Sequence, residues 1–582
     1  MEWFGIVSPR LGQRKDAPTI LIDDAFSAES EGVRVVDSTI QKLPGRLLEL
    51  ADENGDAIAL PETVLAVVAF AAGAVDVATD VTADFGAGVV FRVNGSTDND
   101  GLYTVASSSY SAPNTTIVIE EDFDTGNDDG NVFLGATPAL RYHTLTSAGQ
   151  EYLAILTAFN IFEWMPTTWV LNPIWTVVAG AGCTAWDSTS FNGKMIATNF
   201  SDQPLTWTPG DPAEEMTFPG ALGTVLAKFV TEFENYLILA YMSESGSTYQ
   251  SRIRWSDLGD ETTWDSGDAD AADISMDVPI TGGFGKSGSL NYIFSEKAIH
   301  KQWLVGGAEV WNLEALPGTD GCKAPGSIVN DGPGHLFYYS TEGKIKEINA
   351  GEVSQLIDSY VRAIAPSALA EIRAVSVTEY GEIWWAVPYG AGSTENNRIL
   401  RLKSGLWQVN ERAVSAFGAY GRANSITWAT LPYASWKDWN WTSWRSGEGE
   451  AGYKIDLCGD YAGYTYASHG AALDAGEEVE AYFQLQTDFA KGQALRYFKR
   501  LLKVQTYWAP NPTAYNVLME VKRDGEAHWQ PLATFAVGGE EEIVIVTSPC
   551  SRRAKSFQFR LTPDAAFKFI GAYFGYEPAG ER

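Results

Sequence analysis

The sequence predicts an all-β protein organised around a β-propeller of about six to seven blades. Aromatic residues are abundant in its 582 positions, with 20 Trp, 25 Tyr and 27 Phe, and such side chains suit the half-buried surface of a sheet. Similar short apolar runs also recur through the middle of the chain, beginning near residues 150, 191, 233, 288, 334 and 381. A repeat of about 40–50 residues that holds several short strands is typical of propeller blades.

Each repeat has the same internal order: a turn residue, a short apolar run, a polar turn and a second run that often ends in Trp. Gln150–Trp164 reads QEYLAILTAFNIFEW, and Gly288–Trp303 reads GSLNYIFSEKAIHKQW. These runs are too short for helices and are bounded by Gly, Asn, Asp and Ser, which indicates hairpin strands. A large β-sandwich with accidental spacing is the alternative. The regular spacing favours a propeller over residues 138–474.

Three other segments surround the predicted propeller. Residues 1–57 contain strand-like runs on either side of a Pro-Gly turn, and we expect them to contribute strands to the propeller. Residues 58–137 are rich in Ala, Val, Asp and Gly and contain three strand-like runs, which predicts a small inserted β domain. Residues 475–582 contain six strand-like runs with frequent turns, which predicts a C-terminal antiparallel β-sandwich-like domain. One stretch looks helical, Glu352–Ala370, and Pro366 interrupts it.

Charge and cysteine content exclude several classes of protein. The chain has 41 basic and 74 acidic residues, a net charge of −33, whereas a general DNA clamp needs a basic face. The N-terminus lacks the features of a cleaved secretory signal, and the longest apolar run, Val64–Val75, is too short to span a bilayer. Cys183, Cys322, Cys458 and Cys550 lie far apart, so we expect four buried free thiols rather than disulfides or a zinc site.

No motif in the sequence assigns a catalytic residue, a cofactor or a metal. Gly283–Ser289 (GFGKSGS) superficially resembles a phosphate loop, but Ile280 stands where that loop needs its first Gly. The five histidines form no metalloprotease-type pair, and no GxSxG motif is present. The acidic stretches Ser96–Gly101 and Asp122–Gly130 are read as solvated hairpin turns, with a bound cation as the alternative, because neither completes a calcium-loop pattern.

Three clusters remain as candidate surfaces. A tryptophan cluster suits a core, a protein interface or a sugar-stacking platform; its members are Trp436, Trp439, Trp441 and Trp444. A basic run suits a docking patch or a solvated strand face; it includes Lys491, Arg496, Lys499 and Arg500. An acidic segment is expected to form channel or surface loops; it contains Asp257, Asp260, Asp265, Asp268, Asp270 and Asp273.

Several stretches together resemble the tail nozzle, or hub, proteins of short-tailed bacteriophages, also called tail tubular protein B or packaged-DNA stabilisation proteins. Near the N-terminus, Pro18 is followed by AFSAESEGVRVVD and a QKLPG turn. Further along, RIRWSDLGDETTWDSG (Arg252–Gly267) precedes LNYIFSEKAIHKQW. The resemblance covers Pro18–Gly45 and Gln150–Trp407, and it leaves the inserted domain and the C-terminal domain uncovered.

The resemblance implies a structural role in a virion tail that is assembled in the host cytoplasm. Such proteins form a homo-oligomeric, typically six-membered ring below the portal–adaptor ring, retain packaged DNA, let it pass during ejection and carry tail fibres or spikes. It implies no enzymatic residue and no tight binding to the genomic double-stranded DNA. Two other functions stay open: a β-propeller glycan-degrading enzyme, and a carbohydrate-binding tail adhesin that uses the tryptophan cluster.

Overall fold

The fold is taken from a computed structural model of the whole chain. It describes residues 2–6, 30–31, 33–36, 39–42, 45–51, 56–123, 127–147, 150–166, 168–177, 182–274, 278–306, 309–332, 334–377, 381–421, 454–471, 481–487, 498–509, 514–523, 526, 528–538, 543–554, 557–565 and 567–578. The chain divides into two compact units. The first consists of residues 1–47, 323–413 and 469–582, and the second of residues 48–322 and 414–468.

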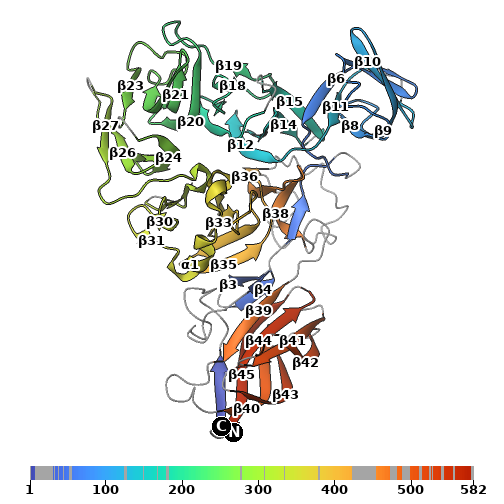
Figure 1. Cartoon of the computed structure of the whole chain (residues 1–582), viewed down its shortest axis with the longest axis vertical. Coiled ribbons are helices and arrows are strands. Elements are labelled where there is room, and N and C mark those ends of the chain that lie inside the picture. The colour runs from blue at the N-terminus through green and yellow to red at the C-terminus, as the bar shows by residue number, and fades with distance from the viewer. Residues whose placement is uncertain are drawn as a thin grey trace, which may run out of the picture. The chain divides into compact units, whose positions relative to one another are not determined.

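The inserted domain of the second unit is a closed six-stranded antiparallel barrel (Figure 1). Its interior is apolar, with Val75, Val93 and Ile117 fully buried. Asn94 fastens the barrel to the sheet that follows, because its side chain accepts a hydrogen bond from the Leu171 N–H at 2.9 Å. The barrel strands, in spatial order, are β10 (Asn114–Ile119), β7 (Ala74–Ala78), β6 (Thr63–Ala71), β11 (Asn131–Leu134), β8 (Val90–Asn94) and β9 (Gly101–Ser111).

Four consecutive four-stranded antiparallel sheets follow the barrel. Within each sheet the strands pair in chain order, so every connection is a hairpin of the kind expected from the sequence repeats. The sheets are β12 (Ala139–Ser147), β13 (Gln150–Thr157), β14 (Asn160–Met165) and β15 (Val170–Thr176); β16 (Asp187–Phe191), β17 (Lys194–Thr198), β18 (Leu205–Trp207) and β19 (Glu214–Glu215); β20 (Val225–Phe233), β21 (Tyr236–Glu244), β22 (Ser247–Trp255) and β23 (Asp270–Asp273); and β24 (Ile280–Ser287), β25 (Leu290–Ser295), β26 (Ile299–Leu304) and β27 (Trp311–Ala315).

The first strands of these sheets pack on one another in succession, β12 on β16, β16 on β20 and β20 on β24. Apolar side chains fill the space between neighbouring sheets; Trp186 and Trp207, for example, share a core with Leu156 and Ile161 of the preceding sheet. Face-to-face stacking of four-stranded sheets through their first strands is the organisation of a propeller. The second unit is therefore propeller-like, as the sequence predicts.

A further sheet of the same type combines strands from distant parts of the chain. Its order is β36 (Ala416–Gly421), β37 (Lys454–Gly459), β38 (Thr465–Ala471) and β5 (Gly45–Leu48). Directly after β5, the Glu49 N–H donates to the Thr465 carbonyl at 2.9 Å, and Leu50 is fully buried. β36 packs on β12, so this sheet adjoins the first of the four.

The first unit contains two more four-stranded sheets, so the described residues hold seven sheets of this type, divided between the two units. They are β28 (Val329–Asn330), β29 (Leu336–Tyr339), β30 (Ile345–Glu347) and β31 (Gly351–Glu352), and β32 (Arg373–Val377), β33 (Glu382–Val387), β34 (Arg398–Lys403) and β35 (Leu406–Glu411). The predicted helical stretch holds η3 (Gln355–Ile357), α1 (Asp358–Arg362) and η4 (Pro366–Glu371), which begins at the proline. A short 3-10 turn, η2 (Pro325–Ser327), precedes β28.

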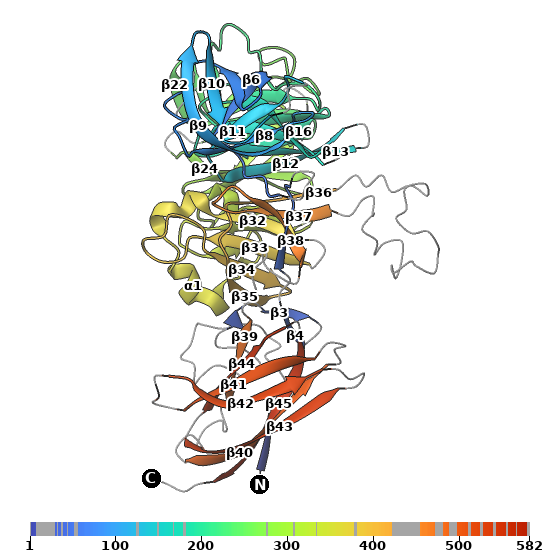
Figure 2. The ribbon, with the colours of Figure 1, turned by 90° about the vertical axis from the view of Figure 1, so that its right-hand side faces the viewer.

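The C-terminal segment forms a two-sheet sandwich (Figure 2) around a core that includes Phe483, Trp508 and Phe569. One sheet has the order β3 (Val33–Val36), β4 (Thr39–Lys42), β45 (Lys568–Pro578), β40 (Lys499–Trp508) and β43 (Val544–Ala554), with β1 (Glu2–Ile6) also paired to β45. The other has the order β2 (Ser30–Glu31), β39 (Tyr482–Thr487), β44 (Phe557–Pro563), β41 (Tyr515–Arg523) and β42 (Gln530–Val537).

The N-terminal segment departs from its predicted place. Residues 1–57 were expected to join the propeller, but of their described strands β5 alone does so, and β1 to β4 pair with strands of the sandwich. Pairing across almost the whole length of the chain, such as Glu2 opposite Tyr576, has no local signature in sequence. Hydrophobic alternation identifies a strand but does not identify its partner.

Candidate functional site

The acidic segment 256–273 forms the connection between β22 and the edge strand β23, together with β23 itself. It contains seven acidic residues and no basic one. Asp265, Asp268, Asp270 and Asp273 are exposed, whereas Asp257 and Asp260 are partly buried. The segment is therefore an acidic surface on the third sheet of the second unit.

Three of the six predicted aspartates, Asp257, Asp260 and Asp270, accept hydrogen bonds from backbone N–H groups of the segment. Asp257 accepts a hydrogen bond from the Asp268 N–H at 2.8 Å, and Asp260 accepts from the hydroxyls of Thr262 and Thr263 at 2.6 and 2.8 Å. The hydrogen bonds from Thr262 lower the pKa of Asp260. Carboxylates that accept several hydrogen bonds stay ionised and fix the loop.

Trp264 anchors the same segment to the core. Its side chain is fully buried, and its indole N–H donates to the Glu261 carbonyl at 2.8 Å. Glu261 in turn pairs with Lys194 of the preceding sheet at 2.7 Å. The loop is thus a packed structure that holds its charges in fixed positions.

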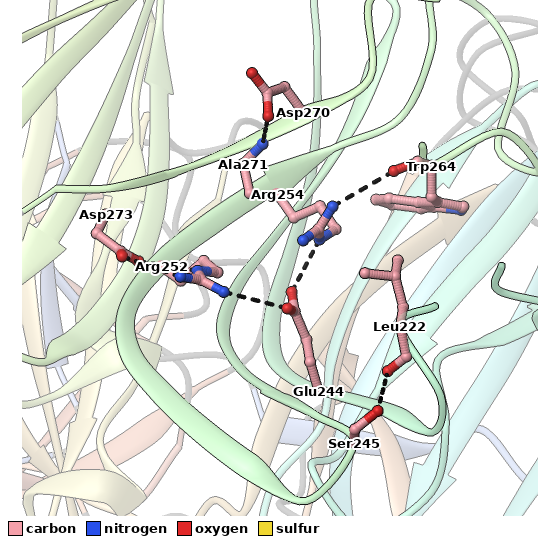
Figure 3. A network of polar contacts seen from close by, with 9 residues as sticks. All are labelled: Leu222, Glu244, Ser245, Arg252, Arg254, Trp264, Asp270, Ala271 and Asp273. Atoms are coloured by element: carbon pink, nitrogen blue, oxygen red, sulfur yellow. Dashed lines mark hydrogen bonds and ion pairs between the residues drawn. The ribbon is translucent and has the colours of Figure 1, made fainter. Parts of the chain in front are cut away.

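Two arginines connect the acidic segment to the β21–β22 hairpin (Figure 3). Arg252 pairs with Asp273 at 3.0 Å and with Glu244 at 3.2 Å, and Arg254 also pairs with Glu244, at 2.9 Å. The hydrogen bond to Asp273 raises the pKa of Arg252 further above its ordinary value. The Arg254 guanidinium also donates to the Trp264 carbonyl. Arg252, Arg254, Glu244 and Asp273 therefore form one ionic network.

Polar side chains on the first strands of neighbouring sheets pair with one another, and the sequence did not predict these pairs. On β12 and β16, Arg141 pairs with Asp187 at 3.1 Å and donates to the Ser188 hydroxyl at 2.7 Å. On β20 and β24, Glu232 pairs with Lys286 at 2.9 Å. The alternation of Arg141 and His143 along β12 was the available signal, but it did not reveal the partners.

His143 lies on β12 as well. Its Nδ1 is 3.0 Å from the Ser188 hydroxyl, and its Nε2 is 3.0 Å from the Ser190 hydroxyl. Burial, with a contribution from the Arg141 charge, lowers the pKa of His143 to about 3. A catalytic triad needs a carboxylate on one imidazole nitrogen, and here both nitrogens face serine hydroxyls. The group is a neutral, structural histidine.

In the first unit, a buried ion pair links β33 and β34. Arg401 and Glu382 are 2.5 Å apart, and their side chains are 2% and 3% exposed. The indole N–H of Trp384 also donates to Glu382 at 2.9 Å. Because both charges are compensated inside the sheet, the pair stabilises a specific strand register rather than offering a site to solvent.

The other predicted clusters have different outcomes. Trp436, Trp439, Trp441, Trp444, Lys491 and Arg496 lie outside the described residues. Lys499 begins β40, and its side chain is likewise not described. Arg500 is exposed on β40 and donates to the Ser551 hydroxyl at 2.9 Å. Gly283–Ser289 belongs to the β24–β25 hairpin, which confirms a turn in place of a phosphate loop.

The four cysteines are buried and free, as predicted. Within the described ranges, no group of three or more His, Cys, Asp or Glu residues is arranged to hold a metal ion. The acidic turn at 96–101 is closed by hydrogen bonds, such as the one from the Ser96 N–H to Asp100 at 2.7 Å. Among the helices of the described part of the chain, none has the length and apolar character needed to cross a bilayer.

The net charge is distributed unevenly over the chain. Residues 475–582 contain 13 basic and 13 acidic residues, so the whole net charge of −33 lies in residues 1–474. The barrel segment, residues 58–137, has 12 acidic residues against one basic residue, Arg92. Arg92 is buried and donates to the Ala57 carbonyl at 3.0 Å. The barrel segment therefore has a strong excess of acidic over basic residues, whereas the C-terminal segment has no net charge.

No family model matches the chain, and no curated protein matches it. Solved structures that match include the Pan2 WD40 domain of Neurospora crassa, with 10% identity and a TM-score of 0.23 over 80% of this chain and 95% of that one. An exo-β-1,3-galactanase of Phanerochaete chrysosporium matches with 10% identity and a TM-score of 0.20 over 92% and 100%. The endosialidase of phage phi92 matches with 13% identity and a TM-score of 0.18 over 53% and 52%. Likenesses this distant do not bear on the activity of this chain.

Proposed function

We propose that this protein is a structural component of a short bacteriophage tail, without enzymatic activity. In this proposal, several copies, typically six, form a nozzle ring below the portal–adaptor ring of the virion. The ring retains packaged DNA, forms the channel for its ejection and supports fibres or spikes. The resemblance supports the proposal. One of its phrases falls on β22 and the loop after it and another on the β25–β26 hairpin of the next sheet, whereas much of Pro18–Gly45 lies outside the described residues.

The observation that carries the proposal is the concentration of negative charge on rigid surfaces outside the C-terminal domain. A protein that neutralises phosphates with Lys and Arg binds DNA and slows its movement. A wall of fixed carboxylates repels the duplex instead. Asp265 and Asp270 are exposed on a loop that Trp264 anchors, so they hold their charge in place during the passage of DNA.

Oligomeric state is the direct test. Mass photometry and negative-stain electron microscopy of the purified protein, alone and with the portal–adaptor complex, should reveal closed rings. Six copies of 63.3 kDa correspond to a particle of about 380 kDa. A strictly monomeric protein that also fails to join the portal–adaptor complex would contradict the proposal.

Two companion measurements separate the nozzle from its rivals. Duplex DNA should migrate without retardation in a gel when the protein is added at moderate salt, because the acidic surface repels phosphate. Host polysaccharides incubated with the protein should keep their chain length. Shortened glycans would favour the enzyme, and strong signals on a glycan array would favour the adhesin.

A further inference from the structure

The outer face of one sandwich sheet combines exposed apolar side chains with cations, which is unusual in so acidic a protein. Ile543, Ile545 and Tyr573 are 54%, 52% and 39% exposed. Ile545 lies on β43 and Tyr573 on β45, the two strands on either side of β40, and Ile543 directly precedes β43. We define the sandwich face as Arg500, Lys503, Ile543, Ile545, Arg553 and Tyr573.

Strand register orders these residues along the outer face. Ile543 and Ile545 lie at the end of β43 that pairs with Trp508, whereas Arg553 and Arg500 lie eight residues further along, about 27 Å away, with Lys503 and Tyr573 between them. Along β43 the side chains alternate between buried and exposed, which separates the core face from the outer face. Arg500 lies directly opposite Arg553, and Gln505 lies opposite both Thr547 and Tyr573. Three cations thus share a face with three exposed apolar residues.

The cations are held against the sheet. Arg500 donates through Nε and Nη2 to the Ser551 hydroxyl at 3.2 and 2.9 Å. The Arg553 guanidinium lies 4.9 Å from the centre of the Phe498 ring. Protein interfaces are enriched in arginine, and an ordered side chain loses less conformational entropy on binding.

A complementary surface exists on the barrel of the same chain. Val90, Leu102 and Val118 are 56%, 57% and 37% exposed on the adjacent strands β8, β9 and β10. Glu120 and Glu121 lie next to them, since the Glu120 N–H donates to the Thr104 carbonyl and Glu121 accepts from the Thr104 N–H. Thr104 is itself opposite Val90. We define the barrel face as Val90, Leu102, Val118, Glu120 and Glu121.

We propose that the sandwich face of one copy binds the barrel face of the next copy and so forms the subunit contact of the ring. The inference rests on the proposed function, because it supplies the interface that a nozzle ring needs. Both faces combine apolar residues with charge of opposite sign, which is the complementarity that selects a partner. A contact between two different surfaces of identical chains is heterologous, and a heterologous contact forms a ring when the rotation between neighbouring copies closes.

Charge reversal with a matched control tests the contact. The Arg500→Glu/Arg553→Glu variant places like charges against the barrel face and should weaken assembly about 100-fold by mass photometry at graded concentrations. The Lys297→Glu/Lys522→Glu variant makes the same change in net charge at residues outside both faces. It should assemble within about threefold of the wild type. Circular dichroism and thermal melting check that each variant folds.

Two further variants examine both sides of the contact. On its own, Glu120→Arg/Glu121→Arg should weaken assembly. Combined with Arg500→Glu/Arg553→Glu, it should give a protein that assembles at least about tenfold more strongly than the Arg500→Glu/Arg553→Glu variant. Ile543→Ser/Ile545→Ser should weaken assembly without altering net charge, because it removes exposed apolar area from the face.

The outcomes distinguish the two proposals. A wild-type protein that stays monomeric contradicts the nozzle ring and the contact together. A wild-type ring that the Arg500→Glu/Arg553→Glu variant still forms overturns the contact and leaves the ring in place. Retardation of duplex DNA that depends on Arg500 and Arg553, with assembly unchanged, also overturns the contact and assigns the face to nucleic acid.

Discussion

His143 illustrates how a single buried side chain makes the stability of this protein depend on pH. Its imidazole lies between Ser188 and Ser190, and burial lowers its pKa to about 3. In the unfolded chain a histidine has a pKa near 6.5. The folded form therefore binds fewer protons than the unfolded form between these two values, so the contribution of His143 is complete above about pH 6.5 and decreases as the pH falls towards 3.

We expect a His143→Gln variant to be less sensitive to acid than the wild type. From pH 7 to pH 5, His143 alone should cost the wild type about 2 kcal/mol of unfolding free energy. Denaturant titrations of both proteins at pH 7, 6 and 5 measure this difference in slope. The variant should be less stable at pH 7, where it lacks the paired hydrogen bonds. Parallel pH profiles for the two proteins would contradict the assignment.

At the scale of elements, the β22–β23 connection depends on a glycine as much as on its acids. Gly267 has a φ of +68°, and a Cβ added there would lie 2.5 Å from the Cγ of Asp257. Asp257 cannot move away without losing its hydrogen bond from the Asp268 N–H. The connection therefore needs Gly267 for two reasons, its left-handed backbone and the close approach of a carboxylate.

The Gly267→Ala variant should lose about 1–3 kcal/mol of unfolding free energy because it combines backbone strain with a steric clash. Gly246→Ala is the matched control: its φ is +81°, and a Cβ there has nothing within 4 Å. The control should lose about 1 kcal/mol, from strain alone. If thermal or chemical denaturation shows equal losses of unfolding free energy for the two variants, the Asp257 side chain moves aside at no cost, which contradicts the prediction.

Some elements could be predicted from the sequence and others could not. Regular hairpin phrases predicted the repeated four-stranded sheets. The composition and three strand-like runs of residues 58–137 predicted a small β domain, though not that its six strands close into a barrel. The partners of β1 to β4 were missed because pairing over hundreds of residues leaves no periodicity. The pairs Arg141–Asp187 and Glu382–Arg401 were missed for a related reason, since each depends on the register of two strands.

At the scale of the whole molecule, charge acts in two opposing directions. Repulsion within residues 1–474, which hold the net −33, destabilises the folded chain. Attraction between the sandwich face and the barrel face stabilises the proposed ring. Salt screens both effects.

Raising the salt concentration from about 0.02 M to about 0.5 M should therefore stabilise the chain and weaken the ring. Thermal melting of the Arg500→Glu/Arg553→Glu variant should shift upward, because only intrachain repulsion is screened. Mass photometry of the wild type should show fewer rings over the same range. Rings that become more abundant with salt would indicate a contact dominated by apolar surface.

The pairing of the first strands with the last ones constrains how the chain is made. Glu49 bonds to Thr465, which is 416 residues later, and Glu2 lies opposite Tyr576. Translation proceeds at roughly 5–20 residues per second, so strand β5 waits about 20–80 s for its sheet to exist. During that time the nascent N-terminus presents unpaired strands that are prone to wrong association. Production of this protein should therefore benefit from slow growth at low temperature and from chaperones that bind nascent chains.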